Sequence, residues 1–354
     1  MYVNKGGVEM KYFPAMCGNE TMKNILKKQK ISDCITPVFE MVNTVAPRKD
    51  KRGYFGYWTD MFNNYDSMTV VDIPMEHQDF LGKMEPEYRQ FFTDVYTKPD
   101  FRVNTLNKFD ISDKVIPTLS HNPSMPYSNQ LIDENSKLSK NFKRKAVRLF
   151  TSSPIVAYED CKKILNENDI LFVDIHENTV EYASIMLDNA RKVKADTNCH
   201  IVIKQTSVGN GYKNTELPDS KISKGTKTYE HIKHSLHIEY KNLGFDGFSD
   251  YVGVRKYTLK NIPIVSPGFL IFDNSDGSYY GYKGTYDDLD SYLDIIKKYE
   301  KSTHWENIKN SHRKTCEGCK VLDKMISTRS SYKSAPKWKR VSMSHYIASI
   351  DEVL

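Results

Sequence analysis

The chain has 354 residues, 39% of them hydrophobic and 27% charged, and a formal net charge of +6. This composition excludes a disordered chain, and the mild positive charge allows an anionic partner without requiring one. No apolar run reaches the roughly 18 residues of a membrane span, and the first residues lack the apolar block of a signal peptide. We therefore expect a cytoplasmic protein whose six cysteines are reduced.

Short apolar, β-branched segments recur along the chain and predict eight strands. They span residues 10–16, 35–42, 68–74, 114–120, 146–151, 170–177, 200–207 and 248–254. Segments with helical patterns lie between several of them, at 19–30, 158–168, 180–195 and 227–244. Continuous apolar strands that alternate with helices are typical of a parallel sheet covered on both faces. The sequence thus predicts a (β/α)8 TIM barrel, with an open doubly wound sheet as the alternative.

The remaining segments predict insertions and a C-terminal extension. Residues 44–67 and 75–113 are long connectors, one expected over the barrel mouth and one outside the barrel. Residues 267–284 predict a β-hairpin that turns at Asp276-Gly277, and residues 285–300 predict an amphipathic helix. We expect a barrel domain over residues 1–300 and a basic appendage over residues 301–354.

Polar side chains stand at or near the ends of most predicted strands, as in "ILFVDIHENT" (170–179), where an apolar run meets a carboxylate and an imidazole. In a TIM barrel the carboxyl ends of the strands form the active face. The residues that we expect there are Glu40, Asp72, Arg148, Asp174, His176, Lys204, Thr206, Asp250 and Tyr251. An ionised side chain inside an apolar strand is costly unless it is paired or solvated, so this set predicts a mixed-charge pocket.

The types of residue in this set suggest roles. Glu40, Asp72, Asp174, His176 and Asp250 suit general acid–base catalysis, and the carboxylates also suit a divalent cation such as Mg²⁺. Arg148 and Lys204, with Thr206 and Tyr251, suit the binding of a carboxylate or phosphate. Salt bridges inside the barrel and helix caps are the structural alternative for each residue.

Three further motifs are weaker. The glycine-containing loop 206–214 follows the seventh strand, where barrels often bind phosphate, but it is not a P-loop. The basic run 140–148 reads as a solvated helix end. Cys316 and Cys319 form a C-x-x-C that can be half of a zinc site with His312 as a third ligand and His304 nearby. Because no second C-x-x-C or C-x-x-H follows, reduced cysteines in a helical tail are the preferred interpretation.

Several short motifs together resemble the beta protein family, which comprises bacterial and phage proteins of about this length, often encoded near mobile or defence genes. The motifs are "KYFPAM", "ITPVFEMV", "VVDIP", "KVIPTLS", "AVRLF", "LFVDIH", "FSDYVG" and the ending "WKRVSMSHYI", with Cys316, Trp338 and His345. The resemblance implies a barrel-like fold and matching positions at Glu40, Asp72, Arg148, Asp174 and Asp250. It brings no mechanism. Tyr346 replaces the second histidine of the family's closing pair, and the segment before the eighth strand is short, which argues against carrying a role over to His345.

Two functions follow from these patterns. The first is an enzyme, such as a hydrolase, that acts on an anionic, phosphate-bearing or nucleotide-like substrate, with a place in phage–host conflict. The second is a non-catalytic nucleic-acid- or protein-binding component of a phage defence or phage-encoded system. The basic runs "KNFKRKAVR" and "KSAPKWKR" favour the second function, and the charged strand ends favour the first.

Overall fold

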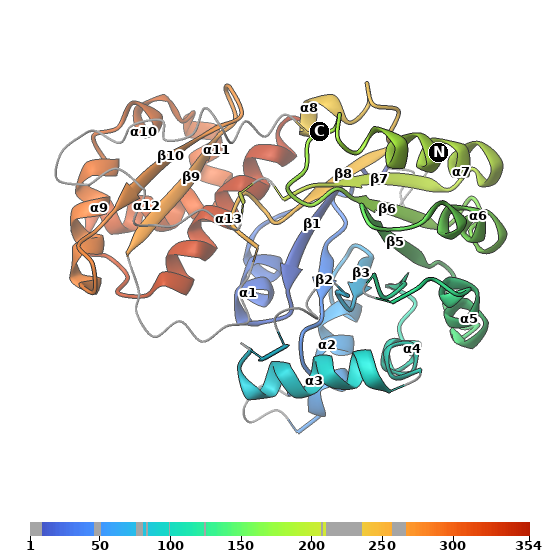
Figure 1. Cartoon of the computed structure of the whole chain (residues 1–354). Helices are drawn as coiled ribbons and strands as arrows, with labels where there is room; N and C mark the ends of the chain where they lie inside the picture. The colour runs from blue at the N-terminus through green and yellow to red at the C-terminus, as the bar shows by residue number, and fades with distance from the viewer. Residues whose placement is uncertain are drawn as a thin grey trace.

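The computed structural model describes residues 9–45, 51–75, 81–82, 84–98, 100–123, 125–206, 208–209, 236–256 and 267–354. All eight predicted strands are present, and they close into one parallel barrel (Figure 1). They are β1 (Tyr12–Cys17), β2 (Val38–Glu40), β3 (Thr69–Asp72), β4 (Val115–Ser120), β5 (Ala146–Phe150), β6 (Ile170–Asp174), β7 (His200–Lys204) and β8 (Gly247–Asp250). Tyr12 pairs with Phe248 where β8 returns to β1. The chain therefore folds as a (β/α)8 TIM barrel, and the open sheet is excluded.

Side-chain alternation divides each strand between the inside of the barrel and its helical cover. The inner core contains Phe13, Ala15, Val38, Val70, Ile116, Ala146, Ile170, Phe172 and Val202. The residues between these positions, such as Phe39, Val71 and Leu149, belong to the core under the helices. Both faces are buried, which explains why the strands read as continuous apolar runs.

Helices surround the barrel in chain order. They are α1 (Glu20–Lys28), α2 (Gly53–Asn63), α3 (Pro86–Thr97), α4 (Phe101–Asn107), α5 (Gln130–Lys137), α6 (Ile155–Ile164), α7 (Ser184–Thr197) and the short α8 (Leu236–Glu239). In the first long connector, α2 packs Trp58 and Phe62 against Phe39 of β2. In the second, α3 and α4 meet through Phe91 and Phe101. Residues 46–50 and 76–80 of the two long connectors, and residues 227–235 of the helix predicted over 227–244, lie outside the described ranges.

The C-terminal part forms a second unit with its own core. The predicted hairpin is present as β9 (Gly268–Asp273) and β10 (Ser278–Lys283). It is followed by a 3-10 turn, η3 (Leu289–Ser291), and by α9 (Tyr292–Tyr299), α10 (Thr303–Asn307), α11 (Asn310–Thr315), α12 (Glu317–Ser327) and α13 (Ala335–Asp351). The second core includes Phe269 and Tyr282 of the hairpin, Tyr299 of α9, Cys319 of α12 and Trp338 of α13. This second core therefore includes residues of the hairpin, which precedes residue 301.

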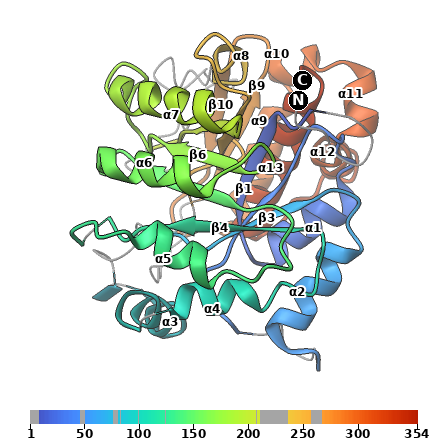
Figure 2. The ribbon, with the colours of Figure 1, turned by 90° about the vertical axis from the view of Figure 1, so that its right-hand side faces the viewer.

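Helix α13 joins this unit to the barrel. Figure 2 shows it beside β1, with the helices of the C-terminal unit around it. Its Tyr346 ring lies 6.4 Å from the ring of Tyr12 in β1, and its Trp338 ring lies 4.9 Å from Phe269 in the hairpin. A helix that is buried on opposite sides in this way fixes the two units relative to each other. Among the described helices, none combines the length and apolar character needed to cross a bilayer.

Gly253 permits this close approach of α13. Its φ is +63°, and a β-carbon there would lie 2.2 Å from the Tyr346 ring. Gly53 is a matched control, because its φ is +70° but nothing lies within 4 Å of its ideal β-carbon. We expect Gly53→Ala to lower the free energy of unfolding by about 1 kcal/mol, from backbone strain alone. Gly253→Ala should cost about 1–3 kcal/mol more, from the clash. Urea unfolding measures both, and equal losses would contradict tight packing of α13 on the barrel.

Candidate functional site

A cluster of buried ionised side chains fills the inside of the barrel near its C-terminal end. Glu40, Asp72 and Asp174 end β2, β3 and β6, Lys204 ends β7, and Arg148 lies in the middle of β5. All five have the inward parity of the core residues two positions before them, and none is more than 2% exposed. The sequence analysis predicted each of these residues, and the structure brings all five together.

Arg148 is the centre of this cluster. Its Nε and Nη2 atoms donate to Asp174 Oδ2 at 3.0 and 2.5 Å. Its Nη1 atom donates to Asp72 Oδ2 at 2.6 Å and to Glu40 Oε1 at 3.2 Å. Lys204 Nζ donates to the same Glu40 oxygen at 2.7 Å. The guanidinium group thus links β5 and its neighbour β6 to the adjacent strands β2 and β3.

Every carboxylate of the cluster faces a cation. Three carboxylates face Arg148 and Lys204, and Arg102 of α4 lies 3.4 Å from Asp72 Oδ1 and 2.7 Å from Glu134 Oε2. A void of about 10 Å³ lies among Asp72, Arg148, Lys204 and their neighbours, which is about the space of one water molecule. Mg²⁺ normally keeps several of its waters, so this void does not fit a hydrated Mg²⁺ ion. The arrangement is a compensated ion cluster rather than a substrate pocket.

Tyr251 links the cluster to the barrel rim. Its hydroxyl donates to Glu40 Oε1 at 3.1 Å, and Lys204 Nζ lies 4.5 Å from the centre of its ring. Lys256 Nζ lies 5.2 Å from the same ring. The other side of Tyr251 lines a cavity of about 50 Å³. This residue therefore belongs both to the cluster and to an opening of the rim.

Residues from three parts of the chain line this rim cavity. Cys17, at the end of β1, Arg255, just after β8, and Lys339 of α13 are its ionisable members besides Tyr251. Burial raises the pKa of the Cys17 thiol to about 12, with Lys339 acting in the opposite direction. Burial lowers the pKa of the Lys339 amine to about 8, with Cys17 acting in the opposite direction and the positive charge of Arg255 contributing to the decrease. At neutral pH the cavity thus contains a neutral thiol and two cations.

His176 and Thr206 lie at the edge of the cluster. His176 follows β6 with a φ of +53°, and its backbone N–H donates to Asp174 Oδ1 at 2.9 Å. Its ring stacks on Phe150, and its Nδ1 atom is 3.6 Å from Asp174 Oδ1. The backbone N–H of Thr206 donates to the carbonyl of His176 at 2.7 Å. His176 is one-third exposed, so it is the most accessible of the predicted acid–base residues around Asp174.

Asp250 does not join the cluster. It has the outward parity of Phe248, and it lies between the barrel and α13. Its carboxylate accepts from Tyr12 Oη at 2.8 Å, from Tyr346 Oη, and from the Val252 N–H at 2.7 Å. Burial, together with this carboxylate, raises the pKa of both tyrosines well above their usual value, so both hydroxyls stay protonated and donate. Asp250 thus holds α13 in place.

Some residues of each of the two basic runs form ion pairs or pack within the fold. Residues 140–148 lead into β5 and do not end a helix, because α5 ends at Lys137. Within this run Lys145 pairs with Asp169 at 3.0 Å. In the second run, Trp338 is buried and Lys339 lines the rim cavity. The glycine-containing loop 206–214 lies mostly outside the described residues.

The sequence analysis missed three rim residues, and it named one histidine, His345, only through the family resemblance and without a role. Cys17 stands at the end of a predicted strand, so the rule that selected Glu40 would have selected it. Arg255 directly follows the predicted strand 248–254, so the same rule would have selected it as well. Lys339 carried no such signal, because it comes from a segment outside the predicted strands. His345 joins His312, Cys316 and Cys319 in a separate buried group in the C-terminal unit. It lies 26 residues after Cys319, on a different helix.

Comparison with known proteins adds little to this geometry. No family model and no curated protein sequence matches the chain. Among solved structures, a chain of the tryptophan synthase complex from Pyrococcus furiosus is similar, with 10% identity and a TM-score of 0.39. The match covers 71% of this chain and 89% of that one. So distant a similarity says nothing about the chemistry, and the fold assignment rests on the strand pairings described above.

The ion cluster leads to a prediction on stability. Arg148→Met leaves buried carboxylates without their main partner, and we expect the free energy of unfolding to fall by about 3–5 kcal/mol. Arg52→Met is the matched control, because Arg52 is 49% exposed and pairs with the exposed Asp60. Its loss should not exceed about 1 kcal/mol. Chemical denaturation compares the two variants, and a small, equal loss in both would show that the cluster is not needed for stability.

Proposed function

We propose that this protein is an enzyme that binds a small anionic substrate at the rim cavity of the barrel. The observation that carries the proposal is the presence of two cations, Arg255 and Lys339, in the lining of one cavity at the carboxyl ends of β1 and β8. Cationic side chains that line one cavity favour an anionic ligand over a neutral or cationic one. In TIM barrels this end of the strands is the place of catalysis.

In this proposal the two cations have different roles. The guanidinium group of Arg255 suits bidentate binding of a carboxylate or phosphate. Lys339 suits binding of the same anion and proton transfer, because an amine with a pKa of about 8 exchanges its proton readily near neutral pH. Cys17 suits contact with the substrate rather than nucleophilic attack, since its high pKa keeps it a thiol.

The buried cluster acts on the substrate through Tyr251. Glu40 accepts the Tyr251 hydroxyl hydrogen bond, and Arg148 and Lys204 hold Glu40 in place. Glu40, Asp72 and Asp174 are thus positioning residues in this proposal, and Arg148 and Lys204 neutralise them instead of clamping the substrate. His176, partly exposed and next to Asp174, is a second candidate for proton transfer at the rim.

The wider biological setting rests on the resemblance to the beta protein family alone. A place in phage–host conflict therefore stays a prediction. The alternative of a nucleic-acid-binding protein has less support, because Lys145 and Lys333 of the two basic runs are engaged in ion pairs and Trp338 is buried. The substrate class that we favour is accordingly a small carboxylate or phosphate compound.

Anion binding at the rim can be measured without knowledge of the substrate. Sulfate is a suitable probe, because its charge does not change between about pH 7 and 9.5. We expect sulfate to raise the thermal midpoint relative to chloride of equal ionic strength. Lys339 is protonated below its pKa of about 8, so the effect should be largest below pH 8 and fade as the pH rises through that value.

Variants of α13 test which lysine is responsible. Lys339→Met should weaken the sulfate effect about tenfold in apparent affinity, from the loss of one charge-assisted contact. Lys337→Met removes an exposed lysine of the same helix and should leave the effect unchanged. Equal behaviour of the two variants, or a sulfate effect independent of pH, would count against an anion site at this cavity.

Catalysis itself requires a broader assay. The protein is incubated with a mixture of small anionic metabolites, and mass spectrometry follows which of them are consumed. We expect the wild-type protein and Lys337→Met to convert the same compound, and Arg255→Met and Tyr251→Phe to lose at least about 90% of that rate. If all four proteins leave the mixture unchanged while sulfate still binds, the cavity is a binding site and not an active site.

A further inference from the structure

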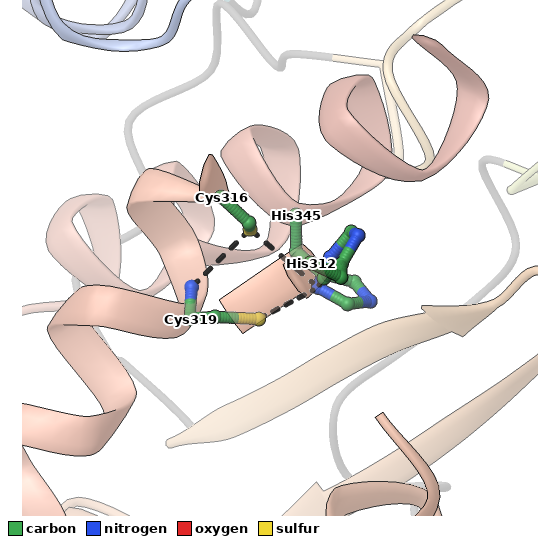
Figure 3. A group of neighbouring side chains, drawn as sticks. All are labelled: His312, Cys316, Cys319 and His345. Atoms are coloured by element: carbon green, nitrogen blue, oxygen red, sulfur yellow. Dashed lines mark hydrogen bonds between the residues drawn. The ribbon is translucent and has the colours of Figure 1, made fainter. Parts of the chain in front are cut away.

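Four metal-ligating side chains meet in the C-terminal unit, far from the ion cluster of the barrel. His312 belongs to α11, Cys316 precedes α12, Cys319 lies in its first turn, and His345 belongs to α13. All four are buried, with at most 5% exposure. Figure 3 shows their side chains pointing toward one another.

The distances between the potential ligand atoms fit a tetrahedral metal site. His345 Nδ1 lies 3.3 Å from Cys319 Sγ, 3.8 Å from Cys316 Sγ and 3.3 Å from His312 Nε2. All four atoms lie within 4.8 Å of one another. A tetrahedral Zn²⁺ ion, with bonds of about 2.3 Å to sulfur and 2.0 Å to nitrogen, separates its ligand atoms by roughly 3.3–3.8 Å.

Hydrogen bonds on the far side of each imidazole orient it for metal binding. His345 Nε2 lies 3.1 Å from the carbonyl of Phe272 in β9, and His312 Nδ1 lies 2.9 Å from Glu352 Oε1. A carbonyl or carboxylate oxygen only accepts, so these two nitrogens carry the protons. The remaining nitrogens, His345 Nδ1 and His312 Nε2, therefore present lone pairs to the same small space. This pairing of a ligand nitrogen with a second acceptor is the usual arrangement at protein zinc sites.

The backbone around the cysteines also supports a bound cation. The Cys319 N–H donates to Cys316 Sγ at 3.3 Å, which stabilises a thiolate at the start of α12. Gly318 lies between the two cysteines. A β-carbon there would be 2.6 Å from the backbone carbonyl oxygen of Val341 and 2.9 Å from the backbone nitrogen of His345. Glycine at this position thus lets α12 approach α13 closely enough for both sulfurs to reach His345.

We propose that His312, Cys316, Cys319 and His345 bind a structural Zn²⁺ ion. Two thiolates and two imidazoles in tetrahedral array favour zinc over Mg²⁺ or Ca²⁺, which prefer oxygen. Four protein ligands leave no position for a substrate, so the role is structural. The ion joins α11, α12 and α13 and, through Phe272, the hairpin. This inference is independent of the function proposed for the barrel.

The consequence for the barrel follows from the position of His345 in α13. Tyr346, the next residue, donates to Asp250, and Lys339 of the same helix lines the rim cavity. A metal that holds His345 therefore also fixes the part of α13 that completes the rim. Loss of the metal should loosen the C-terminal unit and weaken sulfate binding, whereas the strands of the barrel keep their own core.

The test uses full-length protein expressed with zinc in the medium and purified without chelators. Elemental analysis should find about one zinc ion per chain that survives dialysis. Cys319→Ser and His345→Ala should lower this content at least about tenfold. Cys199→Ser, a buried cysteine of the barrel, is the matched control and should retain the metal.

A second measurement covers the case in which these variants do not fold. Wild-type protein stripped by a chelator is titrated with Co²⁺, which should give the visible bands of a tetrahedral ion and a thiolate charge-transfer band. The chelator should also lower the thermal midpoint of wild type and of Cys199→Ser, with recovery on addition of zinc. Protein that contains well under one zinc ion per chain and shows no thiolate–cobalt band overturns the proposal. An oxidised Cys316–Cys319 pair without metal does so as well.

Discussion

Charge compensation inside the barrel is the constraint on which much of this structure depends. Three carboxylates are kept away from water because the guanidinium group of Arg148 reaches all of them, with Lys204 paired to Glu40 and Arg102 shared between Asp72 and Glu134. Hydrogen-bonded ion pairs hold the inward-facing side chains at the C-terminal end of the barrel in one arrangement, whereas apolar side chains can pack in several. Glu40 of this cluster then holds Tyr251 in position at the rim cavity through a hydrogen bond.

Helix α13 contributes Lys339 to the rim cavity and Tyr346 to the core around the barrel. The spacing of its buried residues explains how one helix contacts both units. Lys339, Met343, Tyr346 and Ile350 recur at spacings of four, three and four, and they face the barrel and its rim. Trp338, Val341, His345 and Ala348 recur with the complementary spacing, and they face the second core and the buried His/Cys group. A helix with two buried faces has no polar side, which is why its amphipathic pattern is weak in the sequence.

The sequence was a good guide to the strands and to the five residues of the ion cluster, because apolar periodicity and the position of a charge at a strand end are local signals. Asp250 shows the limit of reading strand ends without their parity. Adjacent residues point to opposite faces, so Asp250 and Tyr251 could not both enter the barrel, and Phe248 marks the outward set. The roles of Lys339 and His345 could not be predicted from the sequence for a different reason. Their roles depend on how a distant helix docks, and no spacing within α13 reveals the partners that it meets. The same limit applies to Cys316 and Cys319, whose interpretation as ordinary reduced cysteines took no account of His345 on a distant helix.

The order of synthesis gives the contact between Tyr346 and Asp250 a further meaning. All eight strands leave the ribosome before α13 does, and chains tend to fold from the N-terminal side as they emerge. A nascent barrel can therefore close while Asp250 still faces water and the rim still lacks Lys339. The anion site proposed at the rim would then be the last part of the molecule to be completed, once α13 has docked.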